Sequence, residues 1–145
     1  MGIRDKLREV VSTKDSPQKI ALSFAVGIFI GMSPLLGLHT VLGIAAAWAF
    51  RLNKLVTIIG VYVTNPWTIV PLYTFATWAG ARLLGIDDII PRINWEAISL
   101  SYLLSEMKPL LLPFLFGSTL MGLLCALLGY FIVYHTVIRG RKSRN

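Results

Sequence analysis

The chain has 145 residues, of which 55% are hydrophobic and only 14% are charged. Its mean hydropathy is +0.68, whereas soluble domains are about 45–50% apolar and about 25% charged. This composition excludes an ordinary soluble domain and predicts one small membrane domain. The single cysteine excludes a disulfide framework and a thiolate-rich metal site.

The first 15 residues alternate apolar and charged side chains at helical spacing. This pattern predicts an amphipathic helix in residues 1–15, too short and too charged to cross a bilayer, that lies on the membrane surface. A solvated helix packed on its own protein is an equally good interpretation. Ser16 followed by Pro17 then predicts a helix start, with serine as N-cap and proline at the first helical position.

Three uncharged runs follow, at residues 20–50, 55–81 and 109–138. Each exceeds the roughly 20 residues that cross a bilayer as a helix. The first two runs contain internal prolines, so each is predicted to be a broken helix. The breaks fall near residues 33–37 and 65–71.

We expect half-helices at 18–32 and 35–50 in the first run, and at 55–64 and 67–84 in the second. The third run has Pro109 and Pro113 in or before its first turn and predicts the plainest transmembrane helix. The predicted fold is therefore an all-α integral membrane protein with broken or re-entrant helices and one long C-terminal transmembrane helix. Its parts are a membrane core (16–85), an outward loop with an interfacial helix carrying Trp95, Ile98 and Tyr102 (86–108), the C-terminal helix (109–138) and a basic cytoplasmic tail (139–145).

The distribution of charge predicts the orientation. The net charge is +2 in residues 1–19, +2 in 51–54, −1 in 82–108 and +4 in 139–145. By the positive-inside rule, both termini and the 51–54 turn belong in the cytoplasm of a bacterial inner-membrane protein. The first run then enters and leaves on the same side as a re-entrant hairpin, which we favour. A single kinked crossing that puts residues 51–54 outside remains the alternative.

At each break a capping residue stands directly before a proline, as Ser33-Pro34 and Asn65-Pro66. This order is typical of a helix N-terminus, where backbone amides and a partial positive charge attract anions. Two such ends within the membrane predict a site for an anionic group such as a phosphate. The alternative, two packing kinks without a ligand, is equally well supported.

His39 is the ionisable residue that lies well inside an apolar run, and Thr40 is beside it. An intramembrane histidine could move a proton or donate to a bound anion. Alternatively, it donates to a backbone carbonyl at the break. The candidate anion-binding residues are Ser33, Pro34, His39, Thr40, Asn65 and Pro66.

No carboxylate lies inside the three runs. This removes carboxylate proton relays, acid–base pairs and carboxylate metal sites from the membrane interior. We therefore predict that the protein is not an enzyme, and we expect no catalytic residue, metal or cofactor.

Small residues recur at four-residue spacing and predict close helix contacts. Because two or three crossings hardly bury two helix breaks, we also expect a homo-oligomer. The basic tail follows from ordinary topology, so no nucleic-acid partner is expected. The predicted helix-packing residues are Ser23, Gly27, Gly31, Ala76, Gly80, Ser118 and Gly122.

Several elements together resemble a bacterial membrane family known as domain of unknown function 2062. They are Ser16-Pro17-Gln18-Lys19, Gly27 with Gly31 and Pro34, Gly37-Leu38-His39-Thr40, Arg51-Leu52-Asn53, Asn65-Pro66 and Pro71-Leu72-Tyr73. Some members look like fusions to glycosyltransferase-type domains, which implies cell-envelope or lipid-linked sugar metabolism. The resemblance also draws attention to Asn53, with Arg51, as support for the site. The simpler role for Asn53 is to cap the helix that begins at Lys54 or Leu55.

The leading functional hypothesis is a small transporter or flippase-like protein for an anionic lipid or lipid-linked head group. Membrane lipids are its expected partners. The alternative is a non-enzymatic scaffold or accessory subunit that binds a glycosyltransferase-type envelope enzyme through its small-residue faces and residues 86–108.

Overall fold

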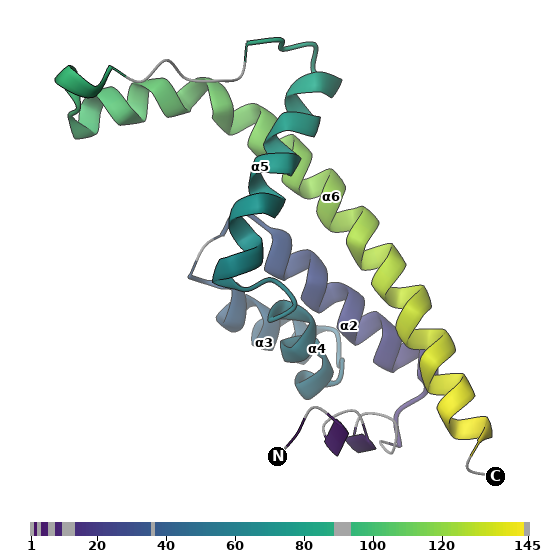
Figure 1. The fold of residues 1–145 in the computed structure, drawn as a ribbon. Helices are drawn as coiled ribbons and strands as arrows, with labels where there is room; N and C mark the ends of the chain where they lie inside the picture. Colours follow the sequence, from purple (N-terminus) through teal and green to yellow (C-terminus); the bar gives the residue numbers. More distant parts are fainter. Residues whose placement is uncertain are drawn as a thin grey trace. The chain divides into compact units, whose positions relative to one another are not determined.

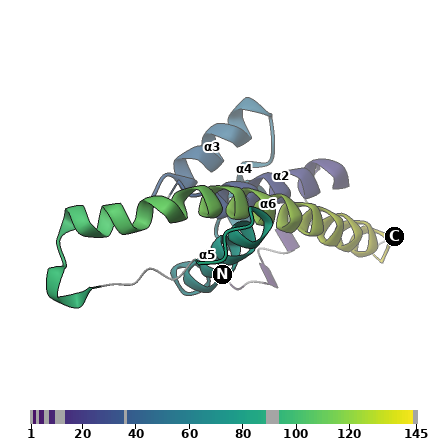
Figure 2. The ribbon, with the colours of Figure 1, turned by 90° about the horizontal axis from the view of Figure 1, so that it is seen from above.

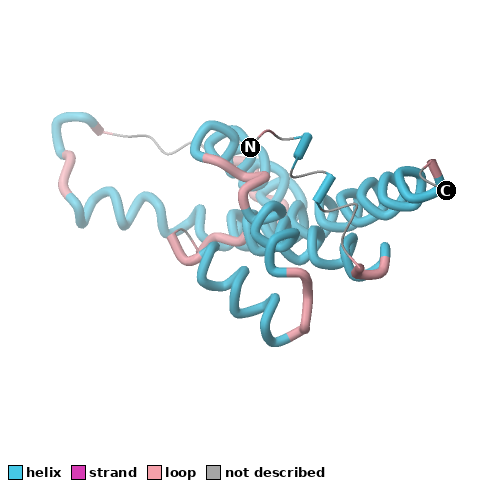
Figure 3. The backbone as a smooth tube through the Cα atoms, turned by 90° about the horizontal axis from the view of Figure 1, so that it is seen from below, coloured by secondary structure: helices cyan, strands magenta, loops and turns pink. Residues whose placement is uncertain are grey.

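The computed structural model describes residues 2, 4–5, 8–9, 14–35, 37–88 and 94–143. These residues form helices joined by loops and contain no strand (Figures 1 and 3), which confirms the all-α prediction. The elements are α2 (Pro17–Met32), α3 (His39–Ala49), α4 (Lys54–Val61), α5 (Pro66–Leu83), the 3-10 helix η1 (Trp95–Ala97) and α6 (Leu100–Lys142).

The chain divides into two compact units. The first unit comprises Met1–Thr64 and Gly122–Asn145, and the second comprises Asn65–Met121. The first therefore holds α2, α3, α4 and the C-terminal part of α6, and the second holds α5, η1 and the first part of α6.

Three helices begin where the sequence predicts a cap. The Ser16 side chain accepts from the Lys19 amide, with Pro17 as the first residue of α2. Asn53 caps α4 by accepting from the Val56 amide. Asn65 begins α5 and forms a capping box with Thr68. Each cap satisfies amides that the first helical turn leaves without an internal partner.

Helices α2 and α4 run parallel and in close contact. The Ser23 hydroxyl meets the Asn53 amide near the start of both helices, and the Thr64 hydroxyl donates to the Gly31 carbonyl near their ends. Helix α3 leads the chain back from the end of α2 to the start of α4. Its direction follows from Thr40, near the start of α3, whose hydroxyl lies 3.1 Å from the Tyr62 hydroxyl, just after the end of α4. The pair α2–α3 is therefore a hairpin whose ends lie at the same end of the first unit.

The C-terminal part of α6 runs antiparallel to α2, and the two helices lie alongside each other (Figures 1 and 2). A Cβ on Gly122 would contact Phe29, and one on Gly129 would meet Ile28. Further along, Val137 packs with Ile20 and Val56 in the buried core. The same end of the first unit therefore contains the start of α2, the start of α4 and the end of α6.

Within the second unit, α5 runs antiparallel to the first part of α6. The backbone of Ala76 lies against Gly117, and Gly80 lies against the Pro113 carbonyl. A Cβ on either glycine would collide with backbone atoms of the other helix. The ring of Tyr73 meets that of Phe114 edge-on at 4.9 Å.

Two helices begin at residues other than those expected. Helix α3 begins at His39 rather than near residue 35, because Pro34 interrupts the chain and Gly37 adopts a positive φ of 84° that a helix does not permit. Helix α6 begins at Leu100, before the expected residue 109, so that Pro109 and Pro113 lie inside it. Packing against α5 supports the helix around Pro113, which is fully buried.

Three predicted surface segments are only partly described. The helix expected in residues 1–15 lies largely outside the described residues, as do residues 89–93 of the 86–108 segment and the last two residues of the basic tail. The described remainder of the 86–108 segment holds Trp95 in η1 and Tyr102 in α6. It is therefore not a single separate helix.

One helix in the described chain, α6, is long and apolar enough to cross a membrane. Its most apolar window has a mean hydropathy of 2.1, and only 22% of that window is buried within the protein. Helices α4 and α5 pass the same test only together, and the chain bends by 68° between them, as in a broken span or a re-entrant loop. Helices α2 and α3 are apolar but shorter. These features give weak support to membrane association.

Candidate functional site

Ser33 ends a helix instead of beginning one. It is the C-cap of α2, and both its amide and its hydroxyl donate to the Ile30 carbonyl, at 3.1 and 2.6 Å. The prediction of a helix N-terminus at Ser33 is therefore wrong. The reason is that the next helix, α3, does not begin until His39, so no helical amides follow the serine directly.

His39, the first residue of α3, contacts the residue that ends α2. Its Nε2 lies 2.9 Å from the Ser33 carbonyl oxygen, and because a carbonyl oxygen only accepts, Nε2 carries the proton and donates. This contact matches the alternative in which the histidine bonds a backbone carbonyl at the break. The imidazole is half-buried, and its Nδ1 is the ring nitrogen that remains for another partner.

Asn65 and Pro66 do form a helix N-terminus, as predicted. The Asn65 side chain accepts from the Trp67 and Thr68 amides, each at 3.0 Å. Both Asn65 and Pro66 are exposed. They begin the second unit, whereas Ser33, Pro34, His39 and Thr40 belong to the first. A joint site made from the two breaks therefore stays a prediction.

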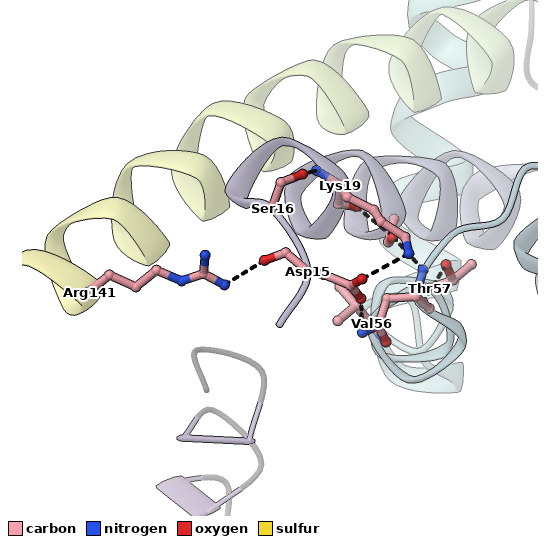
Figure 4. Close-up of polar contacts among 8 residues, drawn as sticks. Asp15, Ser16, Lys19, Val56, Thr57 and Arg141 are labelled. Carbon is pink, nitrogen blue, oxygen red and sulfur yellow. Dashed lines mark hydrogen bonds and ion pairs between the residues drawn. The ribbon is translucent and has the colours of Figure 1, made fainter. Parts of the chain in front are cut away.

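The opposite end of the hairpin contains a polar cluster that we call the Asn53 cluster. It joins the starts of α2 and α4 to the end of α6 (Figure 4). Its members are Asp15, Lys19, Ser23, Asn53, Thr57 and Arg141.

Asn53 is the most connected member of this cluster. Its side-chain amide donates to the Asp15 carboxylate at 2.8 Å, and its side-chain oxygen accepts from the Val56 amide at 3.1 Å. Its backbone amide donates to the Ser23 hydroxyl at 2.9 Å, and its carbonyl accepts from the Thr57 hydroxyl at 3.0 Å. Asn53 thus caps α4, as its simpler predicted role requires, and also ties α4 to α2.

Asp15 receives three donors at the same end (Figure 4). Its carboxylate accepts from the Lys19 ammonium at 2.8 Å and from Asn53, and its backbone carbonyl accepts from the Arg141 guanidinium at 2.6 Å. The hydrogen bond from Lys19, followed by that from Asn53, lowers the pKa of Asp15 below its ordinary value of 3.8. The carboxylate is therefore ionised at neutral pH and holds these helix ends together.

Ser23 is the buried link in the cluster. Its side chain has no exposed surface, and its hydroxyl donates to the Lys19 carbonyl at 2.6 Å while accepting from the Asn53 amide. A buried amide without an acceptor is costly. Ser23 therefore does more than provide a small surface, which was its predicted role.

The other predicted packing residues lie between helices of this chain. Gly27 and Gly31 face the α4 backbone, and Gly122 faces Phe29. In the second unit, Ala76 and Gly80 face α6, and Ser118 on that helix is buried, with its hydroxyl donating to its own helix. These small-residue faces are thus occupied within the chain.

Sequence reasoning missed most of the Asn53 cluster. Asp15 directly precedes the predicted helix start at Ser16, and Arg141 lies in the predicted basic tail, but neither is singled out. Hydrogen-bond partners far apart in sequence have no periodicity to reveal them. The signal that did exist was Asn53 directly before a predicted helix. Among the described residues, no three His, Cys, Asp or Glu side chains are grouped to hold a metal ion.

The family model described as "Uncharacterized protein conserved in bacteria (DUF2062)" matches residues 2–145. The chain therefore belongs to this bacterial family, which confirms the resemblance seen in the sequence. No curated protein and no solved structure matches the chain. The family description names no activity, so function has to be argued from the residues.

Proposed function

We propose that this protein is an integral protein of the bacterial cytoplasmic membrane in which α2 and α3 form a re-entrant hairpin. Helix α2 has 16 residues and α3 has 11, which correspond to lengths of about 24 and about 16 Å. The hydrocarbon core of a bilayer is about 30 Å thick. Neither helix is long enough to cross it alone. The hydrogen bond between Asn53 and Asp15 joins the residue before α4 to the segment just before α2, so the two ends of the hairpin lie together.

The charges of the first unit support one orientation of this hairpin. Lys19, Arg51 and Lys54 lie at or near its open end, and the last turn of α6, with three more basic residues, meets the same end through Arg141. The turn around Ser33 carries no charge. By the positive-inside rule, the open end and the C-terminus face the cytoplasm and the turn enters the bilayer.

The function that this arrangement supports best is transport or flipping of an anionic lipid or lipid-linked head group. The observation that carries the proposal is the hairpin, with the polar Ser33–His39 contact at its turn, followed in the chain by an apolar helix pair that bends by 68° before Asn65 and Pro66. Irregular backbone at membrane depth is tolerated where it is buried in protein or lines a polar cavity. Broken helices of this kind form substrate sites in transporters.

The scaffold alternative is less well supported. It uses the small-residue faces to bind an envelope enzyme or a second copy, but Gly27, Gly31 and Gly80 already contact helices of the same chain. The described residues of the 86–108 segment are largely exposed and remain the surface on which that alternative depends.

A translocation assay tests the proposal. The purified full chain is reconstituted into liposomes containing a fluorescent anionic lipid, and loss of inner-leaflet signal to an added impermeant reductant is followed. We expect faster loss than in protein-free liposomes. We expect His39→Ala and Asn65→Ala to abolish the increase. The matched controls, His135→Ala and Asn94→Ala, remove an exposed histidine and an exposed cap elsewhere and should retain it.

Two results would overturn this proposal. If the wild-type protein gives the same rate of signal loss as empty liposomes, transport of the tested lipid class is excluded. If His39→Ala and Asn65→Ala both translocate the lipid at the wild-type rate, a substrate site at the breaks is excluded.

The orientation is tested separately by labelling. Phe50 is exposed beside the 51–54 turn, so Phe50→Cys in a Cys125→Ala background provides a reporter. We expect an impermeant maleimide to label it in inverted vesicles and not in intact cells with a permeable outer membrane. The opposite pattern contradicts the re-entrant arrangement.

A further inference from the structure

A surface depression lies where α3 ends and α4 begins. It has a volume of about 490 Å³ and is open on one side. Trp48 and Leu52 contribute apolar surface, and Arg51 and Lys54 contribute two cationic side chains. None of its lining residues belongs to the breaks at Ser33 and Asn65.

The two cations at this depression have no anionic partner in the described part of the chain. Arg51 and Lys54 are both exposed, and the ion pair that joins two described residues is that of Lys19 with Asp15. Lys54 is also the first residue of α4. The positive end of the α4 dipole is opposed by the negative end of the α3 dipole at the same depression, so the net positive charge comes from the two side chains.

The backbone at Arg51 is unusual. Its φ is 54°, in the left-handed region that glycine adopts far more readily than arginine. The Leu52 amide donates to the Ala47 carbonyl across this turn, an arrangement that commonly has glycine at the position of Arg51. Residues in such sparsely populated conformations cluster at functional sites.

The aromatic residues of the turn indicate the level of the membrane surface. Trp48 is 75% exposed and Phe50 is 71% exposed. Tryptophan is enriched at the level of lipid head groups, and adjacent basic residues attract anionic lipids. An arginine guanidinium can bind two phosphate oxygens at once, and a lysine ammonium binds as a point charge.

We propose that the depression lined by Trp48, Arg51 and Lys54 binds the phosphate group of an anionic phospholipid on the cytoplasmic side. The cytoplasmic position rests on the proposed function, whereas phosphate recognition rests on the depression itself. This site would hold an anionic lipid at the cytoplasmic surface of the membrane, in addition to the proposed transport site at the breaks.

Binding is measured on the full chain in a non-ionic detergent by tryptophan fluorescence. The probes are short-chain phosphatidylglycerol, short-chain phosphatidylcholine and inorganic phosphate. Trp48→Phe identifies the part of the signal that comes from the depression. We expect saturable binding of phosphatidylglycerol and weaker binding of phosphatidylcholine.

A double variant, Arg51→Asn with Lys54→Gln, should weaken phosphatidylglycerol binding about 30-fold, from the typical contribution of two basic residues near an anionic lipid. Asparagine is chosen because it tolerates the left-handed conformation. The matched control, Arg139→Gln with Lys142→Gln, removes the same charge from the same end outside the depression. It should keep binding within about threefold of wild type, since distant charges are screened. Lys54→Gln alone keeps the turn intact and should give an intermediate loss.

The outcomes separate the sources of the phosphate. Saturable binding of phosphatidylglycerol with little binding of inorganic phosphate supports a lipid site. Tight binding of inorganic phosphate with the same variant dependence overturns the lipid assignment in favour of a soluble phosphate. Equal losses in the two double variants, or no saturable binding, overturn the site. Lipid binding measured in detergent does not depend on translocation. Normal binding without translocation would therefore overturn the proposed function and leave the phosphate site unaffected.

Discussion

The contact between α2 and α4 makes Gly27→Ala an informative substitution. A Cβ at residue 27 would collide with the Thr57 carbonyl oxygen and lie 2.8 Å from the Gly60 Cα and 2.9 Å from the Val61 amide nitrogen. All three are backbone atoms, so no side chain can rotate away. Helix α4 would have to move by on the order of 1 Å to restore ordinary contact distances.

The size of the effect follows from two opposing terms. Overpacking of this kind costs about 1–3 kcal/mol, whereas replacing a helical glycine by alanine gains about 1 kcal/mol. Movement of α4 also stretches the hydrogen bond from the Asn53 amide to Ser23, which is worth about 1 kcal/mol. We expect a net loss of about 2 kcal/mol, or about 4–8 °C in melting temperature for a chain of this size.

Thermal unfolding in detergent, followed by far-ultraviolet circular dichroism, measures this loss. The matched control is Gly122→Ala, also in a helix, where the nearest atom to the new Cβ is a ring carbon of Phe29 at 3.3 Å. Phe29 is partly exposed and its ring can shift by a few tenths of an ångström, so we expect the control to stay within about 1 kcal/mol of wild type. If Gly27→Ala is as stable as Gly122→Ala, the close parallel packing of α2 on α4 is refuted.

Two further predictions concern the Asn53 cluster. Because contacts with Lys19 and Asn53 lower the pKa of Asp15, its ionised form stabilises the folded state above the unfolded pKa of 3.8, and this contribution is lost as pH falls through the lower folded pKa. Melting temperatures of wild type and Asp15→Asn should therefore differ at pH 7, approach each other as pH falls below 3.8, and converge only below the lower folded pKa. A constant difference would contradict this role. Asn53→Ala should destabilise the protein by about 2 kcal/mol, since it removes both a helix cap and a hydrogen bond to a carboxylate. Asn65→Ala removes an exposed cap and should cost about 1 kcal/mol, so equal melting temperatures for the two variants would exclude a contribution from the Asp15 contact.

The sequence by itself determined the helical class and most helix starts. Hydropathy gave the apolar runs, and Ser16-Pro17, Asn53 and Asn65-Pro66 gave three N-termini, because capping is a local interaction between residues two or three apart. The family membership was also visible in these short elements. The same local rule failed at Ser33, where a capping residue before proline ends α2 instead. Proline disfavours a helical conformation for the residue before it but does not require a helix after it.

Only the tertiary structure decided which faces and ends meet. The spacing of Gly27 and Gly31 indicated a contact face, but not that its partner is α4 of the same chain. Pro109 and Pro113 indicated a helix start on local grounds, whereas α6 begins at Leu100 and packing at Pro113 supports its interior.

The Asn53 cluster depends most on tertiary structure. Asp15, Asn53 and Arg141 are far apart in the chain and carry no shared pattern, and they meet because α2 and α4 run parallel while α6 runs antiparallel to them. Local sequence encodes where a helix begins, since the capping groups are neighbours in the chain. The choice of partners for its polar ends comes from the packing of whole helices.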